Sequence, residues 1–274
     1  SARAAGAPDA AAKAAAPASA ARREGCEGGC IRRPGAPYRA AMDATPPRAD
    51  PATLSESGLI EVRALRLTVP SDAGPVNILR GLSLGVARGE AVGLVGPSGS
   101  GKTSLLMVLA GLERATSGSV RFEGRELTGL SEDALAEWRR ARVGIVFQDF
   151  HLIGAMTALE NVAVPLELAG RRDAFDAARA ALADVGLAHR TTHLPGQLSG
   201  QQRVALARAF AAEPALLLAD EPTGNLDHAT GDAVMDLMFA LRARRGATLL
   251  LITHDPRLAA RCDRTVRMAD GRIE

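Results

Sequence analysis

The sequence predicts an α/β fold in which an antiparallel β layer precedes a parallel sheet covered by helices, with a helical segment inserted into the chain. Three observations predict it. LIEVRALRLTV, residues 59–69, alternates apolar and polar side chains as a half-buried strand does. The apolar run EAVGLVG leads through glycines into KTSLLMVLAGL, which has helical spacing. Beyond residue 198, short apolar runs alternate with helical patterns, which favours parallel strands joined by helices.

The remaining elements follow in chain order. ILRGLSLGVARGE predicts a further strand pair with glycine turns, and GSVRFEGREL a strand and a turn. SEDALAEWRRA predicts a helix with Ser131 and Asp133 near its N-cap, and RVGIVFQ a strand. Residues 149–197 have mostly helical patterns and close at Pro195-Gly196. The end of the chain then predicts a helix over 199–212, the strand ALLLAD, the helix TGDAVMDLMFALRARRG and the strand ATLLLITH.

These patterns divide the chain into a tail, a core and an insertion. The core, with its antiparallel β layer, comprises residues 58–147 and 198–274, and residues 148–197 form a helical subdomain. Residues 1–57 are rich in Ala, Pro, Gly and Arg and carry few large apolar groups, so we expect this tail to be disordered. Because the sequence starts at Ser1 and Met42 lies shortly before the first patterned segment, we expect Met42 to be the native start.

Composition narrows the class of protein. Of 274 residues, 47% are hydrophobic and 23% charged, which is ordinary for a globular chain, and the formal net charge of +2 predicts no nucleic-acid partner. Three cysteines, Cys26, Cys30 and Cys262, are too few for a disulfide framework and indicate a reducing, cytoplasmic compartment. Apolar runs such as LLMVLAGL are far shorter than the roughly 18 to 20 residues that cross a bilayer, so a membrane link requires a partner.

The strongest local signal is GPSGSGKT, residues 96–103, which fits G-x-x-x-x-G-K-[ST] between a predicted strand and a predicted helix. The glycines let main-chain N–H groups turn inward, and the helix N-terminus adds positive potential, so the loop suits phosphate. Lys102 would supply a charge to the β and γ phosphates, and the Thr103 hydroxyl would ligate Mg²⁺. The core is therefore predicted to be that of a P-loop NTPase. The predicted nucleotide contacts are Gly96, Pro97, Ser98, Gly99, Ser100, Gly101, Lys102, Thr103 and Ser104.

A second set of polar residues follows the buried strand ALLLAD. The strand places Asp220 and Glu221 at its carboxyl end, where ligands collect in open α/β sheets. Behind a phosphate loop, Asp220 would hold Mg²⁺, and Glu221 would orient and polarise the attacking water. The sequence therefore predicts ATP and Mg²⁺ as ligands.

Five motifs, GPSGSGKT, VFQDF, LSGQQ, LLLADEPTGNLD and LLLITHD, occur in the order found in ATP-binding cassette (ABC) proteins, which residues 58–273 resemble. The resemblance implies an ATPase in which two cassettes, here a homodimer or a paired cassette, face each other head to tail. It further implies that Gln148 contacts Mg²⁺ and senses the γ-phosphate, that Asp227 faces the partner cassette, and that His254 contacts the γ-phosphate and supports Glu221.

A finer resemblance is to the subgroup that serves lipoprotein release and macrolide export. TALENVAVPLELAG, LADEPTGNLD and AARCDR carry it. It implies a separate transmembrane permease subunit and a peripheral location on the cytoplasmic face of the inner membrane. The helical stretch after Gln148 would be the surface on which the permease docks.

The chain departs from the family pattern at two places. No aromatic residue or histidine occurs between Leu59 and Arg121, so the family's adenine-stacking side chain, expected near Val69, is missing and base selectivity should be loose. In QLSGQQR, Ser199 and Arg203 are four positions apart, two fewer than in the family's signature motif. Two residues of a helix amount to roughly 3 Å of rise and about 200° of rotation.

We expect this shortened signature to impair turnover without abolishing it. Ser199 with Gln202 forms a capping-box pattern, which predicts a helix N-terminus there, and Ser199 and Gly200 would still contact nucleotide. The alternative is a regulatory or scaffold subunit that binds ATP and hardly hydrolyses it. A cassette acting on ribosomes or DNA ranks last, because this sequence has neither a second cassette nor a long coiled-coil insertion.

Overall fold

The structure, a computed structural model, describes residues 58–72 and 74–274. The predicted disorder of residues 1–57, the start at Met42, and the cysteines Cys26 and Cys30 lie outside the described residues. Cys262 is half-buried beside β3, and burial raises the pKa of its thiol to about 11.

The antiparallel layer is a four-stranded sheet in the order β2-β1-β4-β5. It consists of β1 (Gly58–Val69), β2 (Val76–Ala87), β4 (Ser117–Phe122) and β5 (Arg125–Glu126). The expected strand pair after residue 76 is wrong, because β2 is one continuous strand. Gly81, which suggested a turn, has φ of 82° and is skipped in the pairing of Leu65 with Leu82 and Arg66 with Arg80. It therefore forms a bulge within the strand.

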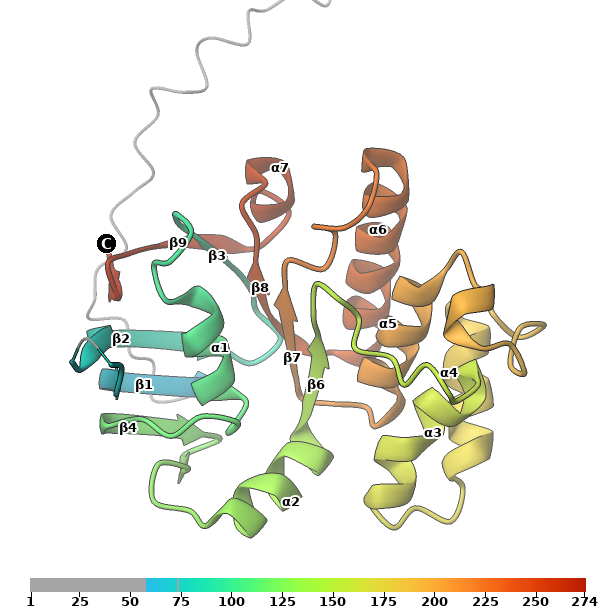
Figure 1. Ribbon diagram of the computed structural model, residues 1–274, viewed down its shortest axis with the longest axis horizontal. Helices are drawn as coiled ribbons and strands as arrows, with labels where there is room; N and C mark the ends of the chain where they lie inside the picture. The colour runs from blue at the N-terminus through green and yellow to red at the C-terminus, as the bar shows by residue number, and fades with distance from the viewer. Residues whose placement is uncertain (1–57, 73) are drawn as a thin grey trace, which may run out of the picture. The chain divides into compact units, whose positions relative to one another are not determined.

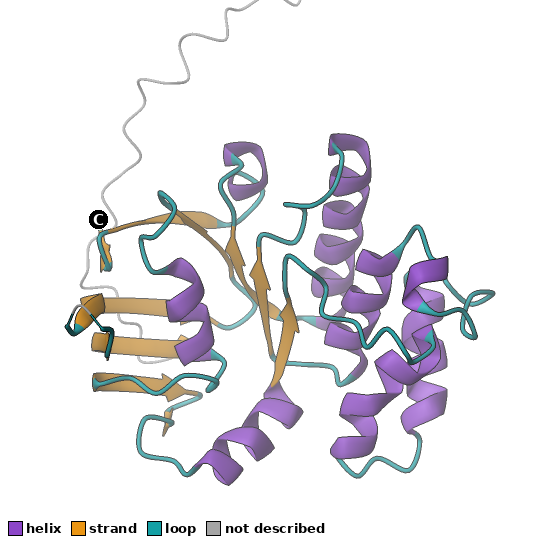
Figure 2. Cartoon of the chain, in the orientation of Figure 1, coloured by secondary structure: helices purple, strands orange, loops and turns teal. Residues whose placement is uncertain are grey.

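The second sheet has six strands in the order β10-β9-β3-β8-β7-β6 and is parallel except between β9 and β10 (Figure 1, Figure 2). Its strands are β3 (Ala91–Val95), β6 (Val143–Val146), β7 (Leu216–Asp220), β8 (Thr248–Ile252), β9 (Arg264–Ala269) and β10 (Arg272–Ile273). Because β3, β6, β7 and β8 run in one direction, the segments that follow them leave the sheet at the same edge.

Each face of the parallel sheet borders its own hydrophobic core. Leu217 and Leu218 on β7 point to opposite faces and belong to different cores. One core lies toward the antiparallel layer and includes residues of α1 (Lys102–Leu109) and α2 (Glu132–Arg142), and α1 lies beside β2 (Figure 1). The other core includes residues of α5 (Gln201–Ala211) and α6 (His228–Arg245). A short helix, α7 (Pro256–Ala259), follows β8.

The inserted segment is helical as expected. It contains α3 (Ala158–Leu168), α4 (Ala174–Asp184) and the 3₁₀ turn η1 (Pro195–Gln197). Helix α3 starts at a capping box formed by Thr157 and Glu160, and α3 and α4 pack on each other and on α5. The buried residues of α3 and α4 share one cluster with those of α5 and α6, so the boundaries 148 and 197 stay a prediction. No helix among the described residues is long and apolar enough to cross a membrane.

Candidate active site

The loop between β3 and α1 wraps its main chain around the Lys102 side chain. A Cβ at Gly96 would lie 2.0 Å from the carbonyl oxygen of Met268, and Gly101, the N-cap of α1, has φ of 97°, so both positions require glycine. Lys102 is 8% exposed, and its Nζ donates to the carbonyl oxygens of Gly96 at 2.9 Å and Pro97 at 2.8 Å. The loop therefore presents a positive charge beside a helix N-terminus, which is an arrangement that attracts anions.

The first turn of α1 is linked to the end of β7. The Thr103 hydroxyl hydrogen-bonds to the Asp220 carboxyl group. Burial raises the pKa of Asp220, the neighbouring Glu221 carboxylate adds to that effect, and the Thr103 hydroxyl and the Lys102 ammonium oppose it. A hydroxyl and a half-buried carboxyl in contact are oxygen ligands of the kind that Mg²⁺ prefers.

Glu221 and His254 form the next pair in the site. Glu221 follows β7 with φ of 46°, and its N–H donates to the carbonyl oxygen of Ile252 at 3.0 Å. Its carboxylate Oε2 hydrogen-bonds with Nδ1 of His254, the second residue after β8. The side chain of His254 is 73% exposed and that of Glu221 22% exposed, so the pair lies at an opening of the fold.

Gln148 follows β6 and lies against the segment after Glu221. Its Nε2 donates to Oδ1 of Asn225 at 3.4 Å, and Nδ2 of Asn225 donates to the Gln148 carbonyl oxygen at 3.3 Å and to Asp149 Oδ1 at 2.8 Å. A Cβ at Gly224 would lie 2.7 Å from Gln148 Nε2. Sequence reasoning missed Asn225, because a residue 77 positions from its partner leaves no periodic signal.

One cavity of about 660 Å³ collects most of the predicted residues. The phosphate loop and Gln148 line it together with Asp220, Glu221 and His254. Pro97 and Ser100, which were also predicted, do not line the cavity and instead accept hydrogen bonds from Lys102 Nζ. The lining residues are Ile78, Gly96, Ser98, Gly99, Gly101, Lys102, Thr103, Ser104, Gln148, Asp220, Glu221, Ile252 and His254.

Ser199 and Gly200 do not line this cavity. They form a turn before α5, in which Ser199 is exposed and Gly200 is the N-cap without a side-chain cap hydrogen bond. The predicted capping box between Ser199 and Gln202 is therefore wrong. Gln202 is 5% exposed, so its side chain is packed into the interior and does not return to the start of the helix.

Asp227 also lies outside the cavity, at the start of α6. Its exposed carboxylate caps that helix by accepting from the Thr230 N–H at 3.0 Å. Hydrogen bonds from the Thr230 side chain and then from its main-chain N–H hold the pKa of Asp227 below its ordinary value. The cap gives Asp227 a structural role in this chain in addition to the predicted contact with a partner.

Comparison with known protein families identifies the family of this chain. The family model described as ABC transporter matches residues 79–224, more than half of the chain. The chain belongs to the ABC transporter family. It is an ATP-binding subunit and an ATPase of that family, whose membrane components are separate chains, and ATP or ADP is its nucleotide.

Relatives of this ABC transporter subunit match nearly their whole length. The lipoprotein-releasing system ATP-binding protein LolD of Geobacter metallireducens is 51% identical over 221 residues, which are 79% of this chain and 98% of the relative. The uncharacterized ABC transporter ATP-binding protein YbbA of Escherichia coli K12 is 49% identical over 220 residues, which are 79% of this chain and 96% of the relative.

Solved ABC cassettes share the fold. The dimeric structure of a post-hydrolysis state of the ATP-binding cassette MJ0796, bound to ADP and Pi, superposes with a TM-score of 0.73 at 36% identity. It covers 78% of this chain and 96% of MJ0796. The α/β core with an antiparallel β layer is thereby confirmed.

Proposed function

We propose that this chain hydrolyses Mg²⁺-bound ATP at a site shared by two cassettes and thereby powers a separate membrane permease, in an envelope lipoprotein-release or export system. The observation that carries the proposal is the cavity in which the phosphate loop meets Asp220 and the Glu221–His254 pair. The phosphate loop with Asp220 suits the phosphates of a nucleotide, and the Glu221–His254 pair suits a water molecule that attacks them.

The residues present fit both a nucleotide and Mg²⁺. A Cβ at Gly99 would meet no atom within 4 Å, so the main chain there is open to a phosphate group. Lys102 would exchange its contacts with loop carbonyls for phosphate oxygens, and Thr103 and Asp220 would hold the metal, with Gln148 completing the set. Within the described residues, no group of three or more His, Cys, Asp or Glu could hold a metal alone. Bound Mg²⁺ supplies positive charge that offsets the charge of the phosphates.

The second half of the cavity would activate water. Glu221 accepts a hydrogen bond from the attacking water and polarises it, and His254 holds the Glu221 carboxylate in place and contacts the γ-phosphate. The Gln148 amide, tied to Asn225 on one side and open to the cavity on the other, reports whether the γ-phosphate is present.

A second cassette would complete the site. Ser199, Gly200 and Asp227 lie outside the cavity of their own chain, and Ser199 and Asp227 are exposed, as residues that contact a partner's nucleotide would be. MJ0796, a structural relative at 37% identity, is dimeric. We infer that the signature segment of one copy faces the phosphate loop of the other.

The membrane partner would dock on the helical segment at the cytoplasmic face of the inner membrane. Four large apolar side chains of residues 148–197 are exposed, and together they offer apolar surface to another protein. Leu168 is the most exposed of them, at 64%. The four are Ile153, Leu168, Phe175 and Leu194. Lipoprotein release is the function named for the LolD relatives, and it is proposed for this chain on that likeness.

A second candidate is a regulatory subunit that binds ATP with little turnover. The spacing of Ser199 and Arg203 favours it, since α5 begins at Gln201, directly after Gly200. The loss of one charge-assisted contact to a phosphate is worth about 1.5–3 kcal/mol, or on the order of a tenfold to hundredfold in rate.

The two candidates are separated by Mg²⁺-dependent ATP hydrolysis in three proteins: the chain as it is, a variant with Gly-Glu inserted after Gly200, and Glu221→Gln. We expect measurable turnover in the first, a gain on the order of tenfold or more in the second, and loss of hydrolysis with retained ATP binding in the third.

Turnover confined to the insertion variant, with ATP still bound by the unaltered chain, would favour the regulatory subunit. Absence of both ATP binding and hydrolysis from the unaltered chain would overturn the proposed function. A Glu221→Gln variant as fast as the unaltered chain would remove Glu221 from the mechanism.

A further inference from the structure

The turn directly after Gln148 has a strained backbone. Phe150 and His151 have φ of 59° and 45°, a left-handed conformation that is costly for residues with side chains, and here two such residues are consecutive. The Phe147 and His151 rings pack edge to face with centroids 4.9 Å apart. Such a turn persists only where surrounding groups hold it.

The group that holds it is the guanidinium of Arg208 on α5. Its Nη2 donates to the Phe150 carbonyl oxygen and its Nη1 to the His151 carbonyl oxygen, both at 2.7 Å. One planar side chain thus clamps the carbonyls of both strained residues, which a guanidinium can do because its N–H groups form a rigid fork.

Arg208 has no acidic partner within the part of the chain that the structure describes. It is part-buried, burial lowers the pKa of its guanidinium, and no carboxylate of the described residues forms an ion pair with it. A charge removed from water without a counter-ion is costly, so the two carbonyl contacts account for its position.

Two asparagines anchor the ends of the same segment. Asn225 binds the Gln148 carbonyl oxygen and Asp149, as described above. Asn161 on α3 is fully buried and donates to the carbonyl oxygens of Ile153, Met156 and Thr157, each at 3.0 Å. Between these anchors, Arg208 on α5 is the only side chain of the described residues that hydrogen-bonds to the main chain of residues 150 and 151.

We propose that Arg208 is a positioning residue that acts through Gln148: by clamping the 150–151 turn it keeps the Gln148 amide at the cavity. Because α5 starts at the signature segment and Arg208 lies about 10 Å farther along the helix, a displacement of α5 by the partner cassette reaches Gln148 through this clamp. The inference rests on the role proposed for Gln148 above.

The test is a double-mutant cycle on the full chain with Arg208→Met, Gln148→Ala and the double variant, reading kcat and KM for ATP. Methionine keeps an unbranched apolar stem, although a shorter one, and removes both donors. We expect Arg208→Met alone to lower kcat on the order of tenfold while KM changes less than about threefold, because the phosphate loop is untouched. In the Gln148→Ala background the same substitution should change kcat less than about twofold.

Arg242→Met is the matched control. Arg242 on α6 is also largely buried and donates to main-chain carbonyl oxygens, those of Gly89 and Ala247, but it also pairs with Asp263 and does not contact the Gln148 segment. It should leave kcat within about twofold at temperatures below its unfolding midpoint. Arg208→Lys, which can reach one carbonyl at a time, should restore part of the lost kcat.

Hydrogen–deuterium exchange supplies a readout independent of turnover. The amides of residues 149–155 should exchange faster in Arg208→Met than in the unaltered chain and in Arg242→Met. Unchanged exchange of these amides would overturn the inference. So would a double variant whose kcat is lowered by the product of the two single-variant factors. A normal kcat in Gln148→Ala would overturn both the role proposed for Gln148 and the clamp that depends on it. A reduced kcat in Gln148→Ala together with an unchanged kcat in Arg208→Met would overturn the clamp alone.

Discussion

The conformation of Glu221 suits the role proposed for it above. Its φ of 46° is uncommon for a side chain of this size, and its N–H is bound to Ile252 on the neighbouring strand. The carboxylate is directed by one further partner, the ring of His254. A carboxylate that is aimed before substrate arrives needs less reorganisation when it activates water.

His254→Ala tests that dependence. Removal of the ring leaves the Glu221 carboxylate without this contact, so we expect kcat for ATP hydrolysis to fall on the order of tenfold to a hundredfold, with nucleotide affinity changed less than about threefold. Steady-state hydrolysis and nucleotide titration measure the two quantities.

His189→Ala is its control, since His189 is exposed and lies outside the cavity. Equal rates in the unaltered chain and His254→Ala would mean that Glu221 is oriented without the histidine.

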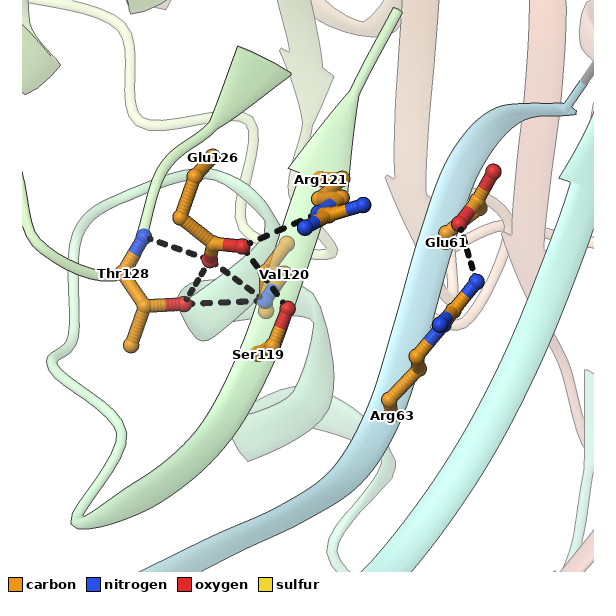
Figure 3. Close-up of polar contacts among 7 residues, drawn as sticks. All are labelled: Glu61, Arg63, Ser119, Val120, Arg121, Glu126 and Thr128. Atoms are coloured by element: carbon orange, nitrogen blue, oxygen red, sulfur yellow. Dashed lines mark hydrogen bonds and ion pairs between the residues drawn. The ribbon is translucent and has the colours of Figure 1, made fainter. Parts of the chain in front are cut away.

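At the scale of elements, the Glu126 carboxylate adds side-chain hydrogen bonds to the hairpin of β4 and β5 (Figure 3). Glu126 accepts from Ser119 Oγ at 2.8 Å, from Thr128 Oγ1 at 2.7 Å and from Arg121 Nε at 3.2 Å, as well as from two main-chain N–H groups. Burial alone would raise the pKa of Glu126, but the hydrogen bonds of Thr128, Ser119 and Arg121 outweigh it and lower the pKa to about 2.

This pKa makes the stability of the hairpin depend on pH. The folded-state pKa lies below the ordinary value of 4.5, so the ionised carboxylate stabilises the fold above about pH 4.5, and the contribution is lost as pH falls toward 2. Because the Glu126 side chain is 41% exposed, solvent screening reduces the effect to about 1 kcal/mol.

Glu126→Gln should therefore lower the free energy of unfolding by about 1 kcal/mol at pH 7, and the difference should shrink at pH 3. Denaturant titration at the two pH values measures it. Glu61→Gln on β1 is the control, because Glu61 has one side-chain hydrogen bond, from Arg63 at 3.1 Å (Figure 3). A difference that is constant between pH 7 and pH 3 would contradict the role of the ionised carboxylate.

At the scale of the whole molecule, the site is an edge of a sheet with a core on each face. The phosphate loop follows β3, Asp220 is the last residue of β7, and His254 is the second residue after β8. The packing of both cores sets how those strands lie. Ser199 and Asp227, in contrast, are exposed and do not line the cavity of their own chain. This arrangement agrees with the proposed function, in which a second cassette completes the site.

Glu221→Gln should dimerise when ATP is added, because ATP that is bound and not hydrolysed keeps the two halves together. Size-exclusion chromatography with light scattering, in the presence and absence of Mg²⁺ and ATP, measures the mass. The double variant Glu221→Gln with Lys102→Ala lacks the charge of the phosphate loop, so it should stay monomeric when ATP is added. A Glu221→Gln protein of unchanged mass with ATP bound would contradict the shared site.

The sequence by itself determined where the polar groups of the cavity lie along the chain. The phosphate loop and Glu221 directly follow buried strands and Asp220 ends one, and at a strand end a short pattern dictates both the turn and the side chains that it presents. The roles given to these residues stay predictions. The layers of the fold were predicted from the periodicity of apolar residues and the family from the order of five motifs, and the comparisons confirmed both.

Only the tertiary structure decided which residues hold that chemistry in place. The contacts of Asn225 with Gln148 and of Arg208 with residues 150 and 151 join segments 77 and 57 to 58 positions apart, and such pairing follows from packing and leaves no periodicity in the sequence. The expected capping box failed for the same reason, since burial of Gln202 outweighs its local preference for a helix start. Local patterns determine the side chains that act, and long-range packing determines which neighbours orient them.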